Sequence, residues 1–301
     1  MNIKSIIKSQ SLRHKILRCF RLLPDKIMLP MQYYLILHRW PGLKNPQRFT
    51  EWIQVYKMNY RNKDLPKCVD KYTVREYVSK KFGNCQILNQ LYQVCDRAED
   101  INWDTLPQKF VVKTTNGGNG DNVLIVKNKL ILNIDETVNC VNSWLKKDYS
   151  SVSREWAYIE ATKHPRIIVE SLLECRGSEK TLDDYKFLCF NGKFRCLWVD
   201  KGRYTNHHRG FWDEKLNFMS EVESDHPTFS SAPALPSNIS EMVTVAETLS
   251  TGFPFVRVDL YNVDGKIYFG EMTFYPWSGY VSFKPDEFDF ALGKYFRDWR
   301  K

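Results

Sequence analysis

The segment 110–126, which reads FVVKTTNGGNGDNVLIV, constrains the fold more than any other part of this sequence. An apolar, β-rich run ends near Lys113, a loop with three glycines follows, and a second apolar run returns. This pattern predicts a strand, a flexible loop and a strand. Glycines let backbone N–H groups approach a polyphosphate closely, and Lys113 can neutralise its charge. An ordinary tight turn has the same pattern, so the hairpin alone leaves nucleotide binding open.

Size and composition indicate a compact globular protein. The 301 residues suffice for one large or two modest domains, and 43% of them are hydrophobic. The eight cysteines are scattered, without a CxxC motif or a cysteine–histidine cluster at zinc spacing, so we interpret them as buried thiols in a reducing compartment. No run approaches the roughly 20 apolar residues that span a bilayer. We therefore expect a cytoplasmic protein.

Positive charge gathers at the N-terminal end of a chain whose formal net charge is +9. Residues 1–24 contain no acidic residue, and their apolar residues recur at near-helical spacing. Their basic residues are Lys4, Lys8, Arg13, Lys15, Arg18 and Arg21. This pattern predicts a basic amphipathic helix, which either packs on the body of the protein or contacts an anionic membrane surface peripherally. We expect no nucleic-acid partner, because no basic–aromatic platform or helix-turn-helix pattern appears elsewhere.

The remaining pattern indicates an α+β protein. Helices are predicted at 33–40, 49–60, 134–145 and 153–160. A further helix is predicted between Asp70, which can cap its N-terminus, and Gly83, which ends it. Strands are predicted at 166–173, 185–190, 194–199, 255–261 and 266–272, with hairpin turns at Asn191-Gly192 and Asp264-Gly265. We interpret the stretch 201–215 as a loop.

Three charged residues lie on the last predicted pair of strands. Arg257 and Asp259 share a strand face because side chains alternate, and the turn at Asp264-Gly265 can bring Glu271 beside Asp259. Such groups in an apolar hairpin are costly unless they are paired or bind a metal, and their oxygens suit Mg²⁺ that bridges to phosphates. The plainer interpretation is an Arg257–Asp259 salt bridge on a solvated face.

Five segments follow one another in a characteristic order. They are DKYTVREYV (70–78), Lys113 with the glycine hairpin, IIVESLLE (167–174), DYKFLCFNGK (184–193) and RVDLY…FGEMTFYPWSG (257–279). This order resembles the ATP-grasp superfamily and, within it, the TupA-like proteins named for teichuronopeptide synthesis. The resemblance implies a helical N-terminal region at 1–66 and an ATP-grasp domain at 67–301. Two α+β subdomains of that domain would clasp ATP.

The resemblance also implies a nucleotide site. Lys113 would contact the α-phosphate and the adenine side, and Lys186 would approach the phosphates from the other subdomain. The loop backbone would fold over the β- and γ-phosphates at Asn116, Gly117, Gly118, Asn119 and Gly120. The strand at 166–173 would contact adenine through Glu170, Ser171, Leu172 and Leu173.

Catalytic and metal roles follow from the same resemblance. Asp259 and Glu271 would hold Mg²⁺, and Arg257 would stabilise the transferred phosphoryl group or an acyl-phosphate. Thr273 stands where many superfamily members have a metal-binding asparagine, so the sequence leaves the number of metal ions open. The implied reaction joins a carboxylate to an amine at the expense of ATP. Separately from the resemblance, the basic and aromatic residues Arg203, His208, Arg209 and Trp277 suit an acidic sugar substrate. An exposed basic loop has the same pattern, so the sequence leaves this assignment open.

The resemblance therefore implies a ligase that attaches an amino acid or another amine to a uronic acid of a cell-surface polysaccharide, whether capsular, O-antigen or teichuronic. Two alternatives stay open. A glycosyltransferase of the same pathway would need a DxD-like site, and the sequence offers only isolated pairs such as Asp183-Asp184. A nucleotide-binding scaffold would bind ATP and Mg²⁺ without turnover, and Thr273 favours that interpretation.

Overall fold

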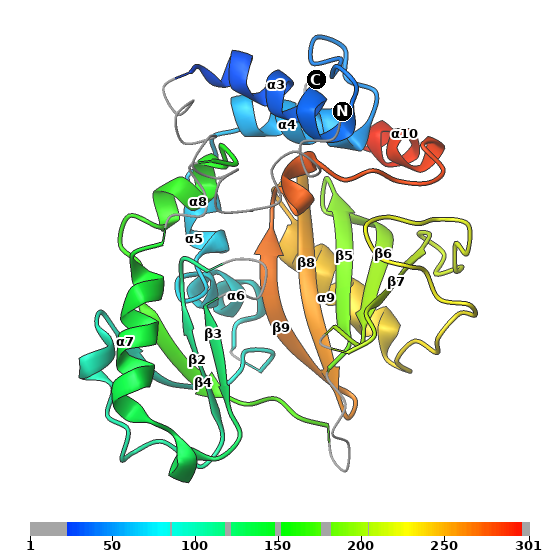
Figure 1. Ribbon diagram of the computed structural model, residues 1–301. Helices are drawn as coiled ribbons and strands as arrows, with labels where there is room; N and C mark the ends of the chain where they lie inside the picture. The colour runs from blue at the N-terminus through cyan, green and yellow to red at the C-terminus, as the bar shows by residue number, and fades with distance from the viewer. Residues whose placement is uncertain are drawn as a thin grey trace.

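The computed structural model has an α+β fold with two antiparallel sheets (Figure 1). It describes residues 23–84, 86–117, 122–147, 152–175, 182–203 and 205–296. Most of the predicted N-terminal amphipathic helix therefore lies outside the described residues. The same is true of three predicted loop residues, Gly118, Asn119 and Gly120.

The smaller sheet contains the glycine hairpin. Its strand order is β1 (Leu91–Cys95), β4 (Ile167–Ser171), β2 (Phe110–Thr114) and β3 (Val123–Val126). The hairpin prediction is confirmed, because β2 and β3 pair antiparallel with Lys113 opposite Val123. Around this sheet lie α7 (Ile134–Leu145) and the short helices η1 (Ala98–Asp100) and η2 (Lys129–Ile131). Its own hydrophobic core forms between the strands and α7.

The larger sheet has five strands. In spatial order they are β7 (His208–Trp212), β6 (Lys193–Lys201), β5 (Asp184–Phe190), β8 (Phe255–Val263) and β9 (Lys266–Thr273). The two predicted hairpin turns are confirmed: φ is +51° and +76° at Asn191 and Gly192, and +51° and +84° at Asp264 and Gly265. Two consecutive positive φ angles define a type I′ turn, whose twist matches that of the paired strands.

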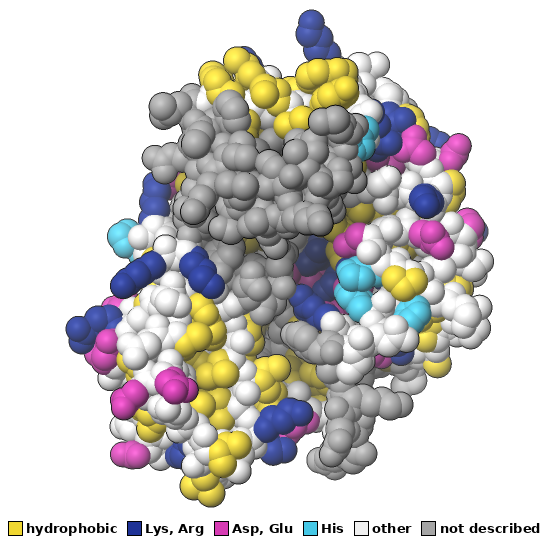
Figure 2. All heavy atoms as spheres, in the orientation of Figure 1, with side chains coloured by type: hydrophobic (Ala, Val, Ile, Leu, Met, Phe, Trp, Pro, Cys, Tyr) yellow, Lys and Arg dark blue, Asp and Glu magenta, His cyan; other side chains and the backbone are white. Residues whose placement is uncertain are grey.

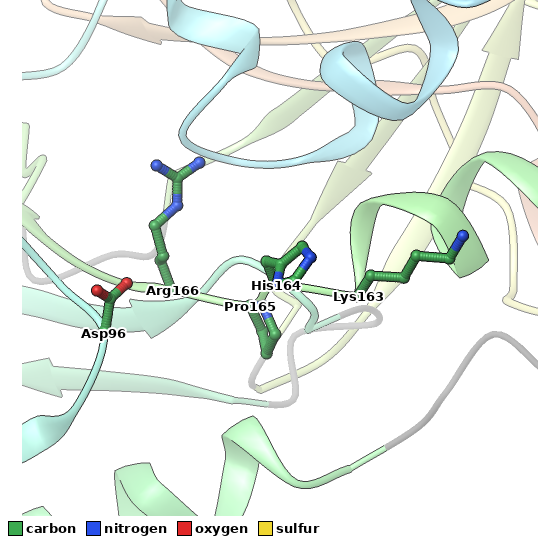
Figure 3. Close-up of a pocket in the computed structure, with 5 residues that line it drawn as sticks. All are labelled: Asp96, Lys163, His164, Pro165 and Arg166. Atoms are coloured by element: carbon green, nitrogen blue, oxygen red, sulfur yellow. The ribbon is translucent and has the colours of Figure 1, made fainter.

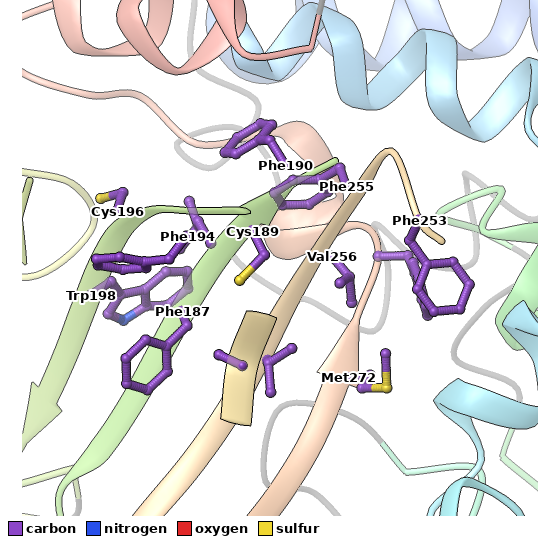
Figure 4. Packing of buried hydrophobic residues seen from close by; sticks show 14 of the residues in the cluster. Phe187, Cys189, Phe190, Phe194, Cys196, Trp198, Phe253, Phe255, Val256 and Met272 are labelled. Atoms are coloured by element: carbon purple, nitrogen blue, oxygen red, sulfur yellow. The ribbon is translucent and has the colours of Figure 1, made fainter. Parts of the chain in front are cut away.

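One face of the larger sheet packs on α9 (Ile239–Ser250), which contacts β5, β6 and β8. Figure 4 shows aromatic rings and cysteine side chains interlocking across these strands. The rings of Phe190 and Phe255 lie 4.8 Å apart, and those of Phe187 and Phe194 lie 5.8 Å apart. These side chains are fully or almost fully buried, so this core fixes the positions of the strands that carry the charged residues.

The N-terminal helices join this core. Around the sheets lie α3 (Asp25–Leu37), α4 (Phe49–Asn59), α5 (Leu65–Val69), α6 (Val74–Phe82), α8 (Trp156–Ala161), η3 (Pro276–Gly279) and α10 (Glu287–Lys294). Phe49 and Tyr56 of α4 are buried in the same cluster as Phe255 of β8. Asp289 of α10 accepts hydrogen bonds from the backbone N–H and the hydroxyl of Thr50. The main core therefore extends across residue 66, where the sequence places a domain boundary.

Three predictions of local structure are wrong. The helix expected at 33–40 spans Asp25–Leu37 and contains Pro30. The expected loop 201–215 contains β7, which pairs with β6 as an edge strand. The first two residues of β7, His208 and Arg209, are polar or charged, and Arg209 forms a salt bridge with Asp200 of β6. The sequence of β7 therefore lacks the alternation of apolar and polar residues by which a strand is recognised. Cys140 is exposed and not buried. No described helix is both long and apolar enough to cross a membrane.

Candidate active site

A row of charged side chains crosses the larger sheet on its face away from α9. Asp259 of β8 pairs with Glu271 of β9 on one side and with Lys186 of β5 on the other. A β-bulge at Gly270 brings Glu271 opposite Asp259, and a Cβ at this glycine would lie 3.0 Å from the carbonyl oxygen of Asp259. Figure 2 shows acidic and basic side chains, with histidines beside them, in a hollow of the molecular surface.

Arg257 joins both carboxylates. Its Nε and Nη2 donate to the two oxygens of Asp259 at 2.7 Å each. The same Nη2 donates to Glu271 Oε1 at 2.9 Å and to Thr273 Oγ1 at 3.0 Å. The predicted convergence of two carboxylates and an arginine is confirmed. Because Arg257 and Asp259 are almost fully buried, the interpretation as a solvated salt bridge is wrong.

Lys186 continues the network toward β6. Its Nζ lies 3.0 Å from Asp259 Oδ2 and 3.4 Å from Asp184 Oδ2, and Asp184 also binds Arg203 at 3.1 Å. Burial alone lowers the pKa of Lys186, but the carboxylates of Asp259 and Asp184 outweigh it and raise this pKa above the ordinary value. Lys186 therefore carries a full positive charge at neutral pH.

Glu271 is the member of the network that solvent reaches. Its side chain is 48% exposed, whereas that of Asp259 is 4% exposed. Partial burial raises the pKa of Glu271, but Arg257, Lys71 and Lys186 outweigh this effect and bring the pKa to about 2. Glu271 thus presents a carboxylate to the hollow at every physiological pH.

The smaller sheet contributes a second ionic group. Lys113 Nζ lies 2.5 Å from Glu170 Oε2, and Arg75 Nη1 of α6 lies 3.0 Å from the other oxygen of Glu170. Glu170 is 5% exposed, so the two cations compensate a buried carboxylate. This arrangement holds Lys113 at the surface of the smaller sheet, where the sequence predicts phosphate contact.

Lys71 connects the two sheets. Its Nζ donates to the carbonyl oxygen of Gly117 in the glycine loop, and its charge is among those that lower the pKa of Glu271. Asn116 anchors the loop from the other side, because its side-chain amide donates to the carbonyls of Trp144 and Lys147 at 3.1 Å each. The loop is therefore attached to the end of α7, while Lys71 lies between the loop and the row of charges.

The predicted adenine contacts lie at the end of β4. The backbone N–H of Ser171 donates to Gln90 and its carbonyl accepts from Asn89, so both groups are already engaged. Glu170 pairs with strands on both sides. Leu172 and Leu173 follow Ser171, the last residue of β4. They are therefore the two predicted adenine contacts that lie outside the hydrogen-bonded part of the sheet.

Aromatic and charged residues border the network at β6 and β7. The rings of Trp198 and Trp277 stack at 4.0 Å, and the guanidinium groups of Arg257 and Arg209 lie 4.7 Å and 4.4 Å from the centre of the Trp198 ring. Arg209 donates to both oxygens of Asp200, at 2.6 Å and 3.2 Å. Burial raises the pKa of Asp200, but Arg209 outweighs burial and holds it well below its ordinary value.

The four predicted sugar-binding residues are only partly brought together. Arg209 and Trp277 are neighbours, with Arg209 5.3 Å from the indole ring, and both bind Asp225. Arg203 lies at the edge of the network on Asp184. His208 lies on the other face of β7, where its ring lies 5.9 Å from that of Phe229.

The histidine at this site is instead the preceding residue in the chain. His207 Nε2 lies 3.0 Å from Asp200 Oδ1, and its ring lies 3.7 Å from that of His226.

The turn that carries Trp277 is supported from the N-terminal helices. Trp277, Ser278 and Gly279 have φ angles of +50°, +56° and +70°, a conformation that costs energy for residues with a Cβ. Lys57 of α4 donates to the carbonyl oxygen of Ser278 at 2.7 Å and to its hydroxyl at 2.5 Å. Gln54 donates to the same carbonyl oxygen at 3.0 Å. These bonds hold the strained turn against the sheet.

A second hollow, of about 490 Å³, lies away from the charged row. Figure 3 shows it beside the start of β4, lined by Asp96, Lys163, His164, Pro165 and Arg166. Arg166 and Lys163 already have partners in the Tyr72 ring and Glu160. This hollow is wide open and contains none of the predicted site residues.

The comparison with protein families decides the assignment. The family described as TupA-like ATPgrasp matches residues 51–297. The chain belongs to this family. The match includes both sheets and every predicted site residue, and it confirms the ATP-grasp fold that the sequence indicates. None of the curated proteins matches the sequence.

Solved structures with a similar fold are distant from this TupA-like protein. A D-alanine–D-alanine ligase from Bacillus anthracis is 19% identical, with a TM-score of 0.40 over 68% of this chain and 56% of that one. An L-amino acid ligase from Bacillus licheniformis is 14% identical, with a TM-score of 0.43 over 90% and 56%. N5-carboxyaminoimidazole synthetase from Staphylococcus aureus, complexed with ADP, is 12% identical, with a TM-score of 0.39 over 68% and 44%. The chain spans about half the length of these proteins.

The residues of this ATP-grasp protein fit a magnesium ion that bridges to phosphates. Asp259 Oδ2 and Glu271 Oε1 converge on one positive atom, Arg257 Nη2, with the Thr273 hydroxyl beside them. Among the described residues, no group of three or more histidines, cysteines or carboxylates could enclose a metal. Mg²⁺ is typically held by one or two carboxylates together with substrate phosphates, and two carboxylates are what this site offers.

Several residues of the ATP-grasp site were not predicted from the sequence. Lys71 and Arg75 follow Asp70 in the segment DKYTVR, where we interpreted them as part of a capped helix. Asp70 accepts from the backbone N–H groups of Tyr72 and Thr73, so Lys71 precedes α6 and is not part of it. Asp184 was considered only as a pair with Asp183. Trp198 lies two residues before Asp200 in an apolar strand and looked like core.

Proposed function

We propose that this protein is an ATP-dependent carboxylate–amine ligase that acts through an acyl-phosphate. The observation that carries the proposal is the convergence of Asp259, Glu271 and Arg257 on neighbouring strands, with Lys71 between this cluster and the glycine loop. Cations outnumber carboxylates around the hollow, as binding of a triphosphate requires. The cations are Lys71, Arg75, Lys113, Lys186, Arg203 and Arg257, and the carboxylates are Glu170, Asp184, Asp259 and Glu271.

The residues of the chain act by position and charge. Lys113 and the loop backbone bind the phosphates of ATP from the smaller sheet, and Lys186 binds them from the larger one. Asp259 and Glu271 would hold Mg²⁺, which would neutralise part of the charge of the phosphates. Arg257 faces the substrate carboxylate and stabilises the charge that develops as its oxygen attacks the γ-phosphorus. The amine then displaces phosphate, so no nucleophilic side chain is required.

For the substrates we propose a uronic acid of a cell-surface polysaccharide and an amino acid or another amine. The stacked Trp198 and Trp277 rings offer an apolar face for a sugar, as neighbours of the charged row. Arg203 is one-third exposed and is the cation at this edge best placed to bind a carboxylate, while Arg209 is committed to Asp200 and Asp225. The TupA-like resemblance supports a polymer acceptor of this kind.

We further propose that the protein works on the cytoplasmic side of a membrane. The basic, apolar residues 1–24 support peripheral contact with anionic lipid. Removing residues 1–22 should release the protein from anionic vesicles and leave turnover in solution unchanged.

Calorimetry with ATP and with UDP-glucuronate, each with and without Mg²⁺, tests the proposal. Magnesium-dependent ATP binding that Lys113→Ala weakens supports it, and ADP release can then be screened with uronic acids and amines. UDP-glucuronate binding without ATP binding would favour the glycosyltransferase. ATP binding without ADP release under any substrate pair would favour the scaffold.

A further inference from the structure

α3 exposes apolar side chains on the side that faces away from the protein. Its inner side chains Met28, Leu29 and Tyr33 are buried, as expected for a surface helix. The exposed set, here called the α3 patch, comprises Ile27, Tyr34, Leu35 and Ile36 of α3, together with Trp40, which follows the helix. A surface helix in contact with water normally has polar residues there. A contiguous exposed apolar patch of this kind marks a contact with another apolar phase.

The α3 patch has an aromatic centre. Trp40 is 65% exposed, and its ring stacks on that of Tyr34 with 4.7 Å between ring centres. Figure 2 shows hydrophobic side chains along the upper edge of the molecule, where Figure 1 places α3, with basic side chains beside them. Tryptophan and tyrosine favour the boundary between lipid headgroups and acyl chains, because their rings combine an apolar body with a polar group.

Basic residues predominate in the sequence around the α3 patch, where Arg39 is paired with Asp286 and Asp289. Asp25 is the single acidic residue between positions 23 and 44, and Arg154 binds it at 3.1 Å. Lys26 and Lys44 are exposed on either side of the patch. The preceding residues 1–22 add six basic residues and no acid. An anionic bilayer attracts basic residues along the whole segment, whereas binding to a protein partner does not require an excess of basic residues.

We propose that the α3 patch is a membrane-contact surface that lies in the headgroup region of an anionic bilayer. The basic residues hold the protein near the surface, and the patch supplies the apolar insertion that charge alone does not give. The inference extends the proposed contact of residues 1–24 to a folded element of the protein. It does not depend on the ligase chemistry.

Flotation of the full chain with vesicles tests this inference. The triple variant Ile27→Ser, Tyr34→Ser, Trp40→Ser is compared with the double variant Leu130→Ser, Ile131→Ser. The latter removes apolar side chains from η2 that are even more exposed, at the far end of the molecule in Figure 1. On vesicles of phosphatidylcholine and phosphatidylglycerol we expect the triple variant to bind at least about tenfold more weakly, and the η2 variant to bind like the unchanged protein. Neither variant changes a residue of the charged row, so ATP binding should persist in both.

Three results would overturn the inference. Equal vesicle binding by the triple variant and the unchanged protein would show that the α3 patch does not insert, even if removal of residues 1–22 abolishes binding. A dimer in solution that only the triple variant dissociates would assign the patch to a second copy. Equally weak vesicle binding by the η2 variant and the triple variant would show that any loss of exposed apolar surface lowers binding, and that the α3 patch has no special role. Each result is independent of whether ATP is hydrolysed.

Discussion

One guanidinium group organises the charged row. Arg257 binds Asp259, Glu271 and Thr273 at once, and the Trp198 ring lies beneath it. Because these bonds form within two adjacent strands, the carboxylates are in position before any ligand arrives. Enzymes that use no nucleophilic side chain lower the reaction barrier mainly through such preorganised charges, which stabilise the transition state.

Asp259→Asn tests the magnesium assignment. The amide keeps the size of the side chain and Arg257 keeps its bond to Glu271, so the fold should persist. Loss of one of two carboxylates should lower magnesium-dependent ATP affinity by more than about 100-fold, since even residues behind metal ligands contribute about 10–100-fold. Calorimetry with and without Mg²⁺ measures this effect, and Glu241→Gln on exposed α9 is the control. An unchanged magnesium dependence would exclude Asp259 as a ligand.

Lys57 predicts a pH dependence of stability. Burial lowers its pKa from 10.5 to about 8, although Glu155 and Asp25 act in the opposite direction. Between these two values unfolding takes up a proton, so the free energy of unfolding should rise with pH. The side chain is completely buried, and the full rise is about 3 kcal/mol.

Urea titrations on either side of this pH window should show the rise in the unchanged protein and lack it in Lys57→Met. A parallel rise in both proteins would assign the effect to other groups. Substitution should also loosen the turn that carries Trp277, which tryptophan fluorescence can report.

Alternation and turn chemistry predicted only part of the centre of the site. Arg257 and Asp259 are two residues apart in a strand, but the register set by Asp264-Gly265 alone would place Gly270 opposite Asp259, and Glu271 comes alongside through a β-bulge that the sequence did not reveal. The sequence could not predict that Lys71 and Arg75 belong there, because they reach the site from another segment through tertiary packing. For the same reason, Arg209 looked available for a substrate although Asp200 already engages it.

At the scale of elements, the β-bulge in β9 gives the site its register. Phe269 and Glu271 oppose Leu260 and Asp259, which leaves Gly270 as the extra residue. Without the bulge, residues after the turn would meet β8 in a shifted register, and Glu271 would point away from Asp259.

Gly270→Ala should disturb this alignment. The new Cβ would lie 3.0 Å from the Asp259 carbonyl oxygen and 3.2 Å from the Tyr261 ring, so β8 and β9 must separate slightly. We expect a stability loss on the order of 1 kcal/mol and an ATP·Mg²⁺ affinity about tenfold lower. Thermal denaturation and calorimetry measure the two effects. Gly42→Ala, whose Cβ would have its nearest neighbour at 3.5 Å, should leave both unchanged. Full affinity in Gly270→Ala would contradict the role of the bulge.

The predicted strands of the larger sheet were found because each central strand is buried and ends in a clear turn. β7 was missed because it is an edge strand whose charged residue is neutralised by its neighbour, which only the folded sheet reveals. α3 was predicted too short because Pro30 outweighed the apolar spacing around it.

At the scale of the whole molecule, two cores support two sheets, and the N-terminal helices belong to the larger core. α4 contributes Phe49, Trp52 and Tyr56, and Phe296, which follows α10, packs against the same rings. The order of motifs predicted two subdomains but not this packing, since helix–helix contacts between distant segments leave no local signal.

A chain that starts at residue 67 should therefore not fold independently. It would lack the α4 side chains that fill the main core and the Lys57 support of the turn. We expect it to be insoluble or to lose near-ultraviolet circular dichroism, whereas a chain that starts at residue 23 should fold. Folding of residues 67–301 alone would confirm the predicted boundary at residue 66.

The contact between α4 and α10 also sets the order of events during biosynthesis. Phe49 meets Phe296 only after the roughly 250 residues between them have been synthesised and have left the ribosome. At about 5–20 residues per second, the apolar face of α4 waits on the order of 10–50 s for its partner. During that time the nascent chain exposes aromatic rings next to a basic N-terminal segment. Its folding in the cell should therefore depend on chaperones that bind early.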